Sequence, residues 1–173
     1  MITFEPWSRP FKSNYADNMP SVLFVCTGNQ FRSPIAAEAF RQQLERDGLA
    51  AQWTVNSAGT WTTPAQPPFR LALDVARALG LDLSRHATRL VDADLLKESD
   101  LVFVMESGHK ESLLIEFPSA RGKVHLMAEA LRGMAFDIPD PAWSPGEAEA
   151  ILRDVADMVR AGSAKIYKMA EGL

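Results

Sequence analysis

Apolar residues recur along the chain in two patterns that alternate with each other. Short apolar runs with β-branched residues are typical of buried strands, and they predict strands at 22–25, 53–56, 101–105 and 124–126. Apolar positions three or four residues apart predict amphipathic helices between them. These helices are expected at 34–47, 69–79, 92–98, 107–117 and 147–169. Strands that alternate with helices indicate an α/β fold with a parallel sheet covered on both faces.

The first predicted strand leads into a loop that opens on Cys26, the only cysteine of the chain. Ser33 is expected to cap the following helix, and Pro34 to take its first position, where no backbone donor is needed. Gly28 is expected to adopt a positive φ, so that successive N–H groups face one concavity. A strand's carboxyl end followed by a helix's amino end favours an anion, because free N–H groups and the helix dipole point at it.

Arg32 follows Cys26 with five residues between them, and this spacing suggests a reaction. A guanidinium offers a planar fork of donors that suits two phosphate oxygens. The same positive field favours the thiolate, which is the nucleophilic form of a thiol, and Ser33 could donate to it. A lone cysteine at a strand end is also often a small buried hydrophobe. The Gly-Asn pair, the arginine and the Ser-Pro pair together favour attack on phosphorus through a cysteinyl-phosphate.

A second loop, at 136–143, carries two aspartates, of which Asp140 lies between two prolines. A phenolate leaving group with a pKa near ~10 departs slowly at neutral pH unless an acid protonates it. A carboxyl group held in a stiff loop could supply that proton and later activate the hydrolytic water. Asp137 is interpreted as a solvated turn residue.

The run from Val25 to Pro34 resembles the signature loop of the low-molecular-weight protein tyrosine phosphatases, and the resemblance extends from about Ser21 to the end. It implies a single-domain, three-layer sandwich around a four-stranded parallel sheet of order 2-1-3-4. It also implies a phosphate-binding loop that comprises Thr27, Gly28, Asn29, Gln30, Phe31, Arg32 and Ser33.

The same resemblance assigns roles to single residues. Cys26 falls on the nucleophile, Arg32 on the phosphate-binding arginine and Asp140, in an Asp-Pro pair, on the general acid. Asn29 and Ser33 fall on residues that support the loop, and His86 on a histidine that braces it through Asn29. Trp61 and Trp143 are interpreted as aromatic walls for a substrate ring. His109 and His125 are given no role.

Two positions depart from the family pattern. Ala142 follows the Asp-Pro pair where phosphotyrosine-specific relatives usually carry an aromatic residue. Gln30 replaces the aliphatic residue of those relatives and also the threonine of a protein-arginine phosphatase branch. Hydrolysis of protein phosphotyrosine is therefore the first prediction, and a protein-arginine or other small phosphomonoester phosphatase is the alternative. Arsenate reductase, which normally needs two further cysteines, and an inactive phosphopeptide-binding module rank lower.

Length and composition agree with one soluble globular domain. Residues 1–20 are predicted to be an N-terminal extension and 21–173 the phosphatase domain. The single cysteine suits the reducing cytoplasm, and the net charge of -4 argues against nucleic acid as a partner. We expect a phosphorylated protein or peptide as substrate and inorganic phosphate as product. No metal, cofactor or membrane is expected to take part.

Overall fold

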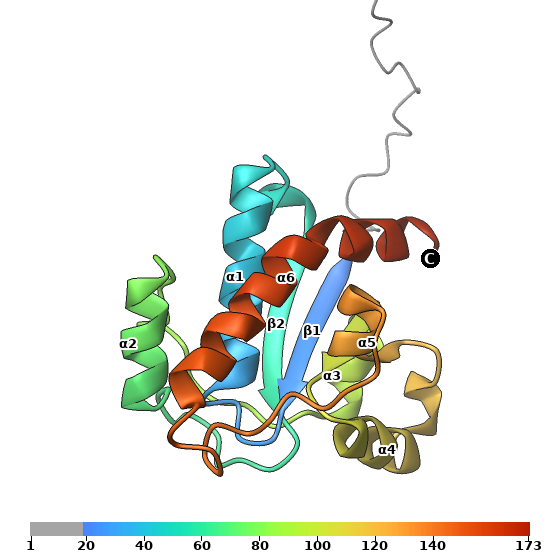
Figure 1. Ribbon diagram of the computed structural model, residues 1–173. Helices are drawn as coiled ribbons and strands as arrows, with labels where there is room; N and C mark the ends of the chain where they lie inside the picture. Colours follow the sequence, from blue (N-terminus) through green and yellow to red (C-terminus); the bar gives the residue numbers. More distant parts are fainter. Residues whose placement is uncertain (1–18) are drawn as a thin grey trace, which may run out of the picture.

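A four-stranded parallel sheet organises the computed structural model, which describes residues 19–173 (Figure 1). The strands lie in the order β2-β1-β3-β4, as predicted. Strand β1 (Ser21–Cys26) pairs with β2 (Thr54–Gly59) on one side and with β3 (Leu101–Val104) on the other. Strand β4 (Val124–Leu126) pairs with β3 and forms the second edge. The first eighteen residues of the expected N-terminal extension lie outside the described part of the chain.

The predicted helices are present, with small shifts of their bounds. They are α1 (Arg32–Arg46), α2 (Arg70–Ala78), α3 (Ala93–Glu98), α4 (Ser107–Glu116) and α6 (Ala148–Glu171). Helix α5 (Met127–Arg132) was not predicted, because six residues directly after a strand are too few to show a helical period. Two 3-10 turns, η1 (Ala50–Gln52) and η2 (Pro118–Ala120), complete the described structure.

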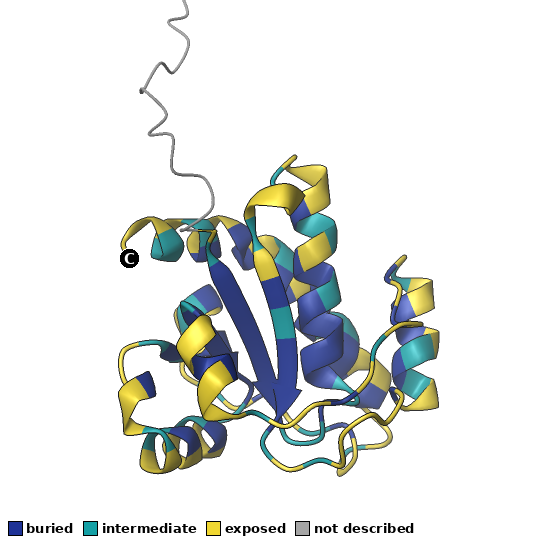
Figure 2. Ribbon diagram, turned by 180° about the vertical axis from the view of Figure 1, so that it is seen from behind, coloured by how far each residue is buried: buried dark blue, intermediate teal, exposed yellow. Residues whose placement is uncertain are grey.

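Two apolar cores sandwich the sheet and give the predicted three layers. On β1, Val22 and Phe24 face a core that α1, α2, α5 and α6 complete. Leu23 and Val25 face a smaller core that α3 and α4 cover. Figure 1 shows α6 crossing in front of the sheet and α1 standing beside β2, and Figure 2 shows the dark, buried strands from behind. Burial on both faces explains why β1 reads as a continuous apolar run.

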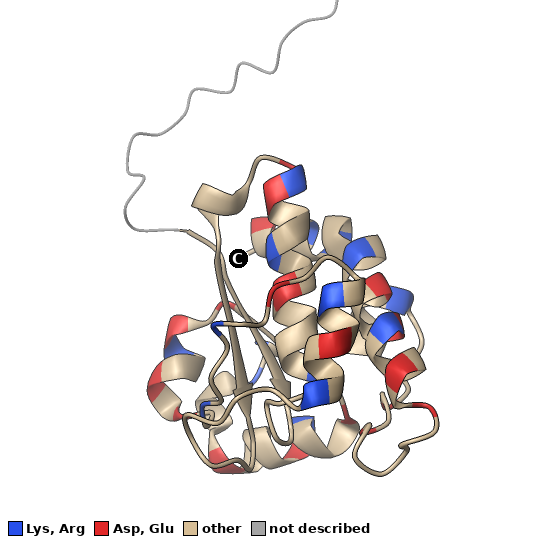
Figure 3. Ribbon diagram, turned by 90° about the vertical axis from the view of Figure 1, so that its left-hand side faces the viewer, with Lys and Arg blue, Asp and Glu red and all other residues tan. Residues whose placement is uncertain are grey.

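Charged residues are confined to helices and loops within the described range. Figure 3 shows strands without Lys, Arg, Asp or Glu, whereas the outer faces of the helices carry both signs. A strongly apolar sheet with a charged periphery is the ordinary arrangement of an α/β domain. No helix between residues 19 and 173 is long and apolar enough to cross a bilayer.

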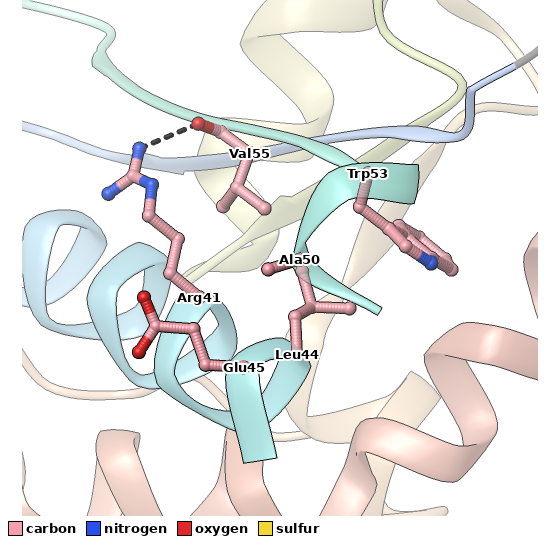
Figure 4. Close-up of a pocket in the computed structure, with 6 residues that line it drawn as sticks. All are labelled: Arg41, Leu44, Glu45, Ala50, Trp53 and Val55. Carbon is pink, nitrogen blue, oxygen red and sulfur yellow. Dashed lines mark hydrogen bonds between the residues drawn. The ribbon is translucent and has the colours of Figure 1, made fainter. Parts of the chain in front are cut away.

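A pocket of about 230 Å³ lies at the amino end of edge strand β2, where Leu44, Ala50 and Trp53 form its apolar side (Figure 4). Arg41 of α1 lies across it and donates a hydrogen bond to the Val55 carbonyl at 2.6 Å. This contact occupies a backbone acceptor on an edge strand, which would otherwise be open to another chain. The pocket is at the opposite end of the strand from Gly59, the partner of Cys26.

Two local sequence predictions were wrong. Helix α1 already begins at Arg32, so Ser33 lies inside its first turn and does not cap it. Asn29, with φ of 55°, adopts the left-handed conformation that was expected of Gly28. Asparagine tolerates this conformation better than most residues, because its short polar side chain can bond locally.

Candidate active site

The Cys26–Arg32 loop occupies the carboxyl end of the central strand β1. Cys26 is the last residue of β1, and Arg32 is the first residue of α1. The loop between them therefore spans from a strand's end to a helix's start, which is where α/β sheets place anionic ligands. Neighbouring strand β3 ends at the same edge, and the Met105 N–H donates to the Val25 carbonyl at 3.2 Å. Residues that follow β3 are thereby brought beside the loop.

The sulfur of Cys26 lies among donors at the base of this loop. The side chain is 2% exposed. Its Sγ accepts a hydrogen bond from the Asn29 N–H at 3.3 Å and lies 3.0 Å from the Ser33 hydroxyl. Because both groups can donate, they can stabilise negative charge on the sulfur. Because the Ser33 hydroxyl does not cap α1, it is available to contact the sulfur directly.

Asn29 ties the loop to helix α1, to strand β2 and to the segment that contains Arg89. Its Nδ2 donates to the hydroxyls of Ser33, at 2.8 Å, and Ser57, at 3.0 Å. Its Oδ1 accepts from the Arg89 N–H at 3.0 Å. The side chain is fully buried, with 0% exposure, so these three bonds satisfy an amide that has no access to water. They also hold the Asn29 N–H toward Cys26.

Arg32 is buried to 1% exposure and has carboxylates on both sides. Its Nη2 donates to Asp140 Oδ2 at 2.9 Å and, more weakly, to the Thr27 hydroxyl at 3.5 Å. Its Nη1 donates to Glu106 Oε1 at 2.5 Å and to the Ile138 carbonyl at 2.7 Å. A buried guanidinium needs such partners, because an unpaired charge in the interior is costly. The structure therefore brings together the nucleophile, arginine and acid expected from the sequence.

The loop that carries Asp140 is anchored at two points. The Ile138 N–H donates to the Met105 carbonyl at 2.9 Å, and Ile138 itself is buried. Asp137 is exposed, as expected of a solvated turn residue, and it also accepts bonds from the N–H and the hydroxyl of Ser107, at 2.7 and 3.0 Å. These contacts fix the loop against the start of α4. Asp140 is aimed by this framework, and its Oδ1 accepts from the Ala142 N–H at 3.0 Å.

Two histidines contact the loop, His86 at Asn29 and His109 at Thr27. His86 Nε2 donates to the Asn29 carbonyl at 2.7 Å, and burial lowers the pKa of His86, so that it is neutral near pH 7. His109 Nε2 lies 2.8 Å from the Thr27 hydroxyl, and burial lowers its pKa as well. His109 and Glu106 were not selected from the sequence. Their position directly after the third predicted strand was the available signal, because parallel strands end at one edge.

The rim of the site is aromatic and polar. Trp61 and Trp143 are 83% and 87% exposed, so both rings can be reached by a substrate. Phe31 packs against Phe69 in a tilted arrangement, with ring centroids 4.6 Å apart. Gln30 Nε2 donates to the Pro67 carbonyl at 2.8 Å. A surface depression of about 490 Å³ beside the loop is lined by Gly28, Gln30, Trp61, Thr62, Thr63 and Gln66.

Comparison with known proteins agrees with this geometry. Residues 21–171 match the family model described as "Low molecular weight phosphotyrosine protein phosphatase". The Escherichia coli K12 low molecular weight protein-tyrosine-phosphatase Etp is 37% identical over 121 residues, which cover 70% of this chain and 76% of Etp. A protein-arginine-phosphatase of Bacillus subtilis is 30% identical over 147 residues, which cover 80% of this chain and 96% of the relative.

A solved structure extends the comparison to the fold. It is the YwlE arginine phosphatase in a cysteine-to-serine mutant with a phosphorylated active-site serine. It superposes with a TM-score of 0.79 at 28% identity and covers 86% of this chain and 96% of its own. Fold and site together define a phosphatase of the cysteine-dependent class. The chain belongs to the low-molecular-weight protein tyrosine phosphatase family.

Proposed function

We propose that this chain hydrolyses phosphotyrosine in proteins through a cysteinyl-phosphate, without a metal ion. The observation that carries the proposal is the convergence on one loop of a donor-surrounded sulfur, a buried guanidinium and a carboxyl group. Cys26 Sγ lies 3.0 Å from the Ser33 hydroxyl, and Asp140 lies 2.9 Å from the Arg32 guanidinium. The phosphorylated serine in the YwlE mutant supports a covalent intermediate at the matching place.

The reaction would proceed in two displacements. The Cys26 thiolate forms the S–P bond while the ester P–O bond breaks, and Asp140 gives its proton to the departing oxygen. The loop N–H groups and Arg32 stabilise the charge that develops on the equatorial oxygens. Water then attacks phosphorus, Asp140 accepts a proton from it, and the S–P bond breaks. Inorganic phosphate leaves and the thiolate is regenerated.

Replacement of Cys26 and Asp140 tests the chemistry. Cys26→Ser should abolish turnover of an aryl phosphate in the presence of EDTA while inorganic phosphate still binds. Asp140→Asn should slow an ester with a poor leaving group by about 10²–10⁴-fold, and an ester with an acidic leaving group far less. Asp157→Asn is the matched control, because Asp157 lies exposed on α6 and pairs with Arg160 rather than with Arg32. Turnover by Cys26→Ser at the wild-type rate would exclude the covalent route.

The preference for phosphotyrosine should be tested against phosphoarginine, the substrate that one relative's name indicates. A protein-arginine phosphatase is 30% identical over most of its length, so phosphoarginine is the second candidate. Rates on matched phosphotyrosine, phosphoarginine and phosphoserine peptides would decide between them. We expect phosphotyrosine to be preferred, because the exposed rings of Trp61 and Trp143 can pack against an aromatic leaving group. A higher kcat/KM on phosphoarginine would reverse the order.

The remaining expectations concern partners and location. We expect the substrate to be a phosphorylated protein or peptide, and the product to be inorganic phosphate. Action in the cytoplasm, with neither nucleic acid nor membrane as a partner, stays a prediction. Equal activity on free phosphotyrosine and on phosphotyrosyl peptides would show that the protein part of the substrate contributes little.

A further inference from the structure

We propose that His109 is a positioning residue, which holds the Thr27 hydroxyl and, through it, the phosphate-binding Arg32. The inference rests on the proposed phosphatase function, since it concerns the same loop. Four side chains form a closed ring here. His109 contacts Thr27 at 2.8 Å, Thr27 accepts from Arg32 at 3.5 Å, and Arg32 donates to Glu106 at 2.5 Å. Glu106 Oε1 lies 3.9 Å from His109 Nε2 and closes the ring.

The four side chains of this ring lie next to the nucleophile and the phosphate-binding arginine. Thr27 follows Cys26 directly, and Glu106 and His109 lie just beyond the carboxyl end of β3. His109 is buried to 7% exposure and Arg32 to 1%, so water competes little for these contacts. A rotation of the Thr27 hydroxyl or of Glu106 would therefore be felt at the guanidinium. The position of Arg32 depends on groups outside the Cys26–Arg32 loop as well as on the loop itself.

The surroundings of His109 determine which ring nitrogen carries its proton. Nδ1 is buried and, among residues 19–173, has no hydrogen-bond partner. An N–H at Nδ1 would be unsatisfied, whereas the Glu106 carboxylate favours a proton at Nε2. Nε2–H then donates to Thr27 Oγ1, which also accepts from Arg32. The Thr27 O–H is left free to donate to an oxygen of an anion bound in the loop.

Protonation of His109 would disturb this arrangement. Four charged or titratable groups face the imidazole, namely Glu106, Arg32, Asp140 and Asp137. A second proton would place a cation beside the Arg32 guanidinium and draw Glu106 toward the imidazole. Burial lowers the pKa of His109, so the change falls below its ordinary value of about 6.5. Affinity for phosphate should therefore weaken at mildly acidic pH. The ionisation of phosphate itself also changes with pH, but it affects all variants equally, so it can be separated from the effect of His109.

The test measures inhibition by inorganic phosphate and kcat/KM on an aryl phosphate from neutral pH downward. His109→Leu removes the donor, and we expect about tenfold weaker phosphate inhibition, the cost of one buried hydrogen bond. His109→Gln retains an amide donor near the Nε2 position, so it should restore most of the affinity without the histidine's acid-dependent loss. His125→Gln is the control. His125 lies on β4 and packs against Phe103 rather than against the loop, so the pH profile should be that of the wild type.

A double-mutant cycle separates positioning from simple stability. In a Thr27→Val background the contact is already lost, so His109→Leu should cause little further change in phosphate inhibition. Each variant is measured at a temperature where circular dichroism shows it folded. Independent, additive losses, or wild-type inhibition by phosphate in His109→Leu, would overturn the proposal. A wild-type protein that binds phosphate without turnover would instead refute the proposed function. The same cycle, measured as direct phosphate binding by titration calorimetry, would then still test His109.

Discussion

Asn29 forms hydrogen bonds through its side chain and through both of its backbone groups. Its amide bonds to Ser33, Ser57 and Arg89, its N–H to the Cys26 sulfur and its carbonyl to His86. It does so in a left-handed conformation, with φ of 55°. One residue thus links the nucleophile, the helix start and two flanking segments.

Replacing Asn29 should therefore cost both stability and activity. In Asn29→Ala the Ser33 and Ser57 hydroxyls and the Arg89 N–H lose a buried partner, and alanine is strained at this φ. We expect the free energy of unfolding, measured by urea denaturation, to fall by about 2–4 kcal/mol.

A glycine at the same position provides the informative comparison. Asn29→Gly removes the same hydrogen bonds but relieves the strain, so it should be less destabilised than Asn29→Ala by about 1 kcal/mol. Gln52→Ala, at an exposed position in η1, should change stability little. An Asn29→Ala protein as stable as the wild type would show that the loop does not depend on the hydrogen bonds of Asn29.

At the scale of elements, the end of β2 is packed against the loop. The N–H groups of Thr60 and Trp61 donate to the carbonyls of Cys26 and Thr27, both at 3.0 Å. Gly59 allows this approach, because a Cβ there would lie 2.6 Å from the Thr27 carbonyl oxygen. The strand end therefore sets the position of the loop backbone and requires the smallest residue.

Gly59→Ala should impair the site more than the fold. The added methyl would meet backbone, which cannot rotate away, so the loop has to shift by several tenths of an ångström. We expect kcat/KM on an aryl phosphate to fall at least tenfold, with a loss of unfolding free energy of about 1–3 kcal/mol. Gly146→Ala is the control, because a Cβ there meets nothing within 4 Å. Full activity of Gly59→Ala would mean that the loop tolerates displacement.

The contact between α5 and α6, unlike that of Gly59, stabilises the fold and lies away from the active site. A Cβ on Gly162 of α6 would lie 2.9 Å from the Leu131 Cβ on α5. Gly162→Ala should lower the free energy of unfolding by about 1–3 kcal/mol through overpacking, despite alanine's higher helix propensity. Its kcat/KM at a temperature where it is folded should stay close to wild type. Stabilisation would show that Leu131 moves aside easily.

For the molecule as a whole, the periodicity of the sequence predicted most of the architecture. Strand and helix order follows from alternating apolar runs, and the sheet order followed from the family resemblance. Helix α5 and the exact start of α1 were not predictable, because short helices and caps depend on tertiary contacts. In the site, Cys26, Arg32 and Asp140 carry recognisable local patterns. Glu106 and His109 do not, because only the pairing of β3 with β1 brings them to the loop.

The histidines give the whole molecule a pH-dependent stability. Burial lowers the pKa of all three, His86, His109 and His125. Below about pH 6.5 the unfolded chain binds protons at these positions that the folded protein does not, so unfolding is favoured as pH falls. Their stabilising contribution is thus fully present above this pH and is lost as the pH drops through the lowered folded-state values.

Urea denaturation from pH 7 downward tests this coupling. The slope cannot exceed about 1.4 kcal/mol per pH unit for each histidine, because that is the linkage limit for one proton. His86→Gln and His109→Gln should each flatten the pH dependence between about pH 6.5 and 5, where most carboxylates are still ionised. The His86→Gln protein should also be less stable at neutral pH if its amide fails to reach the Asn29 carbonyl. A free energy of unfolding that rises on acidification through this range would require a histidine whose charged form is stabilised by folding, which is the reverse of what burial does at these sites.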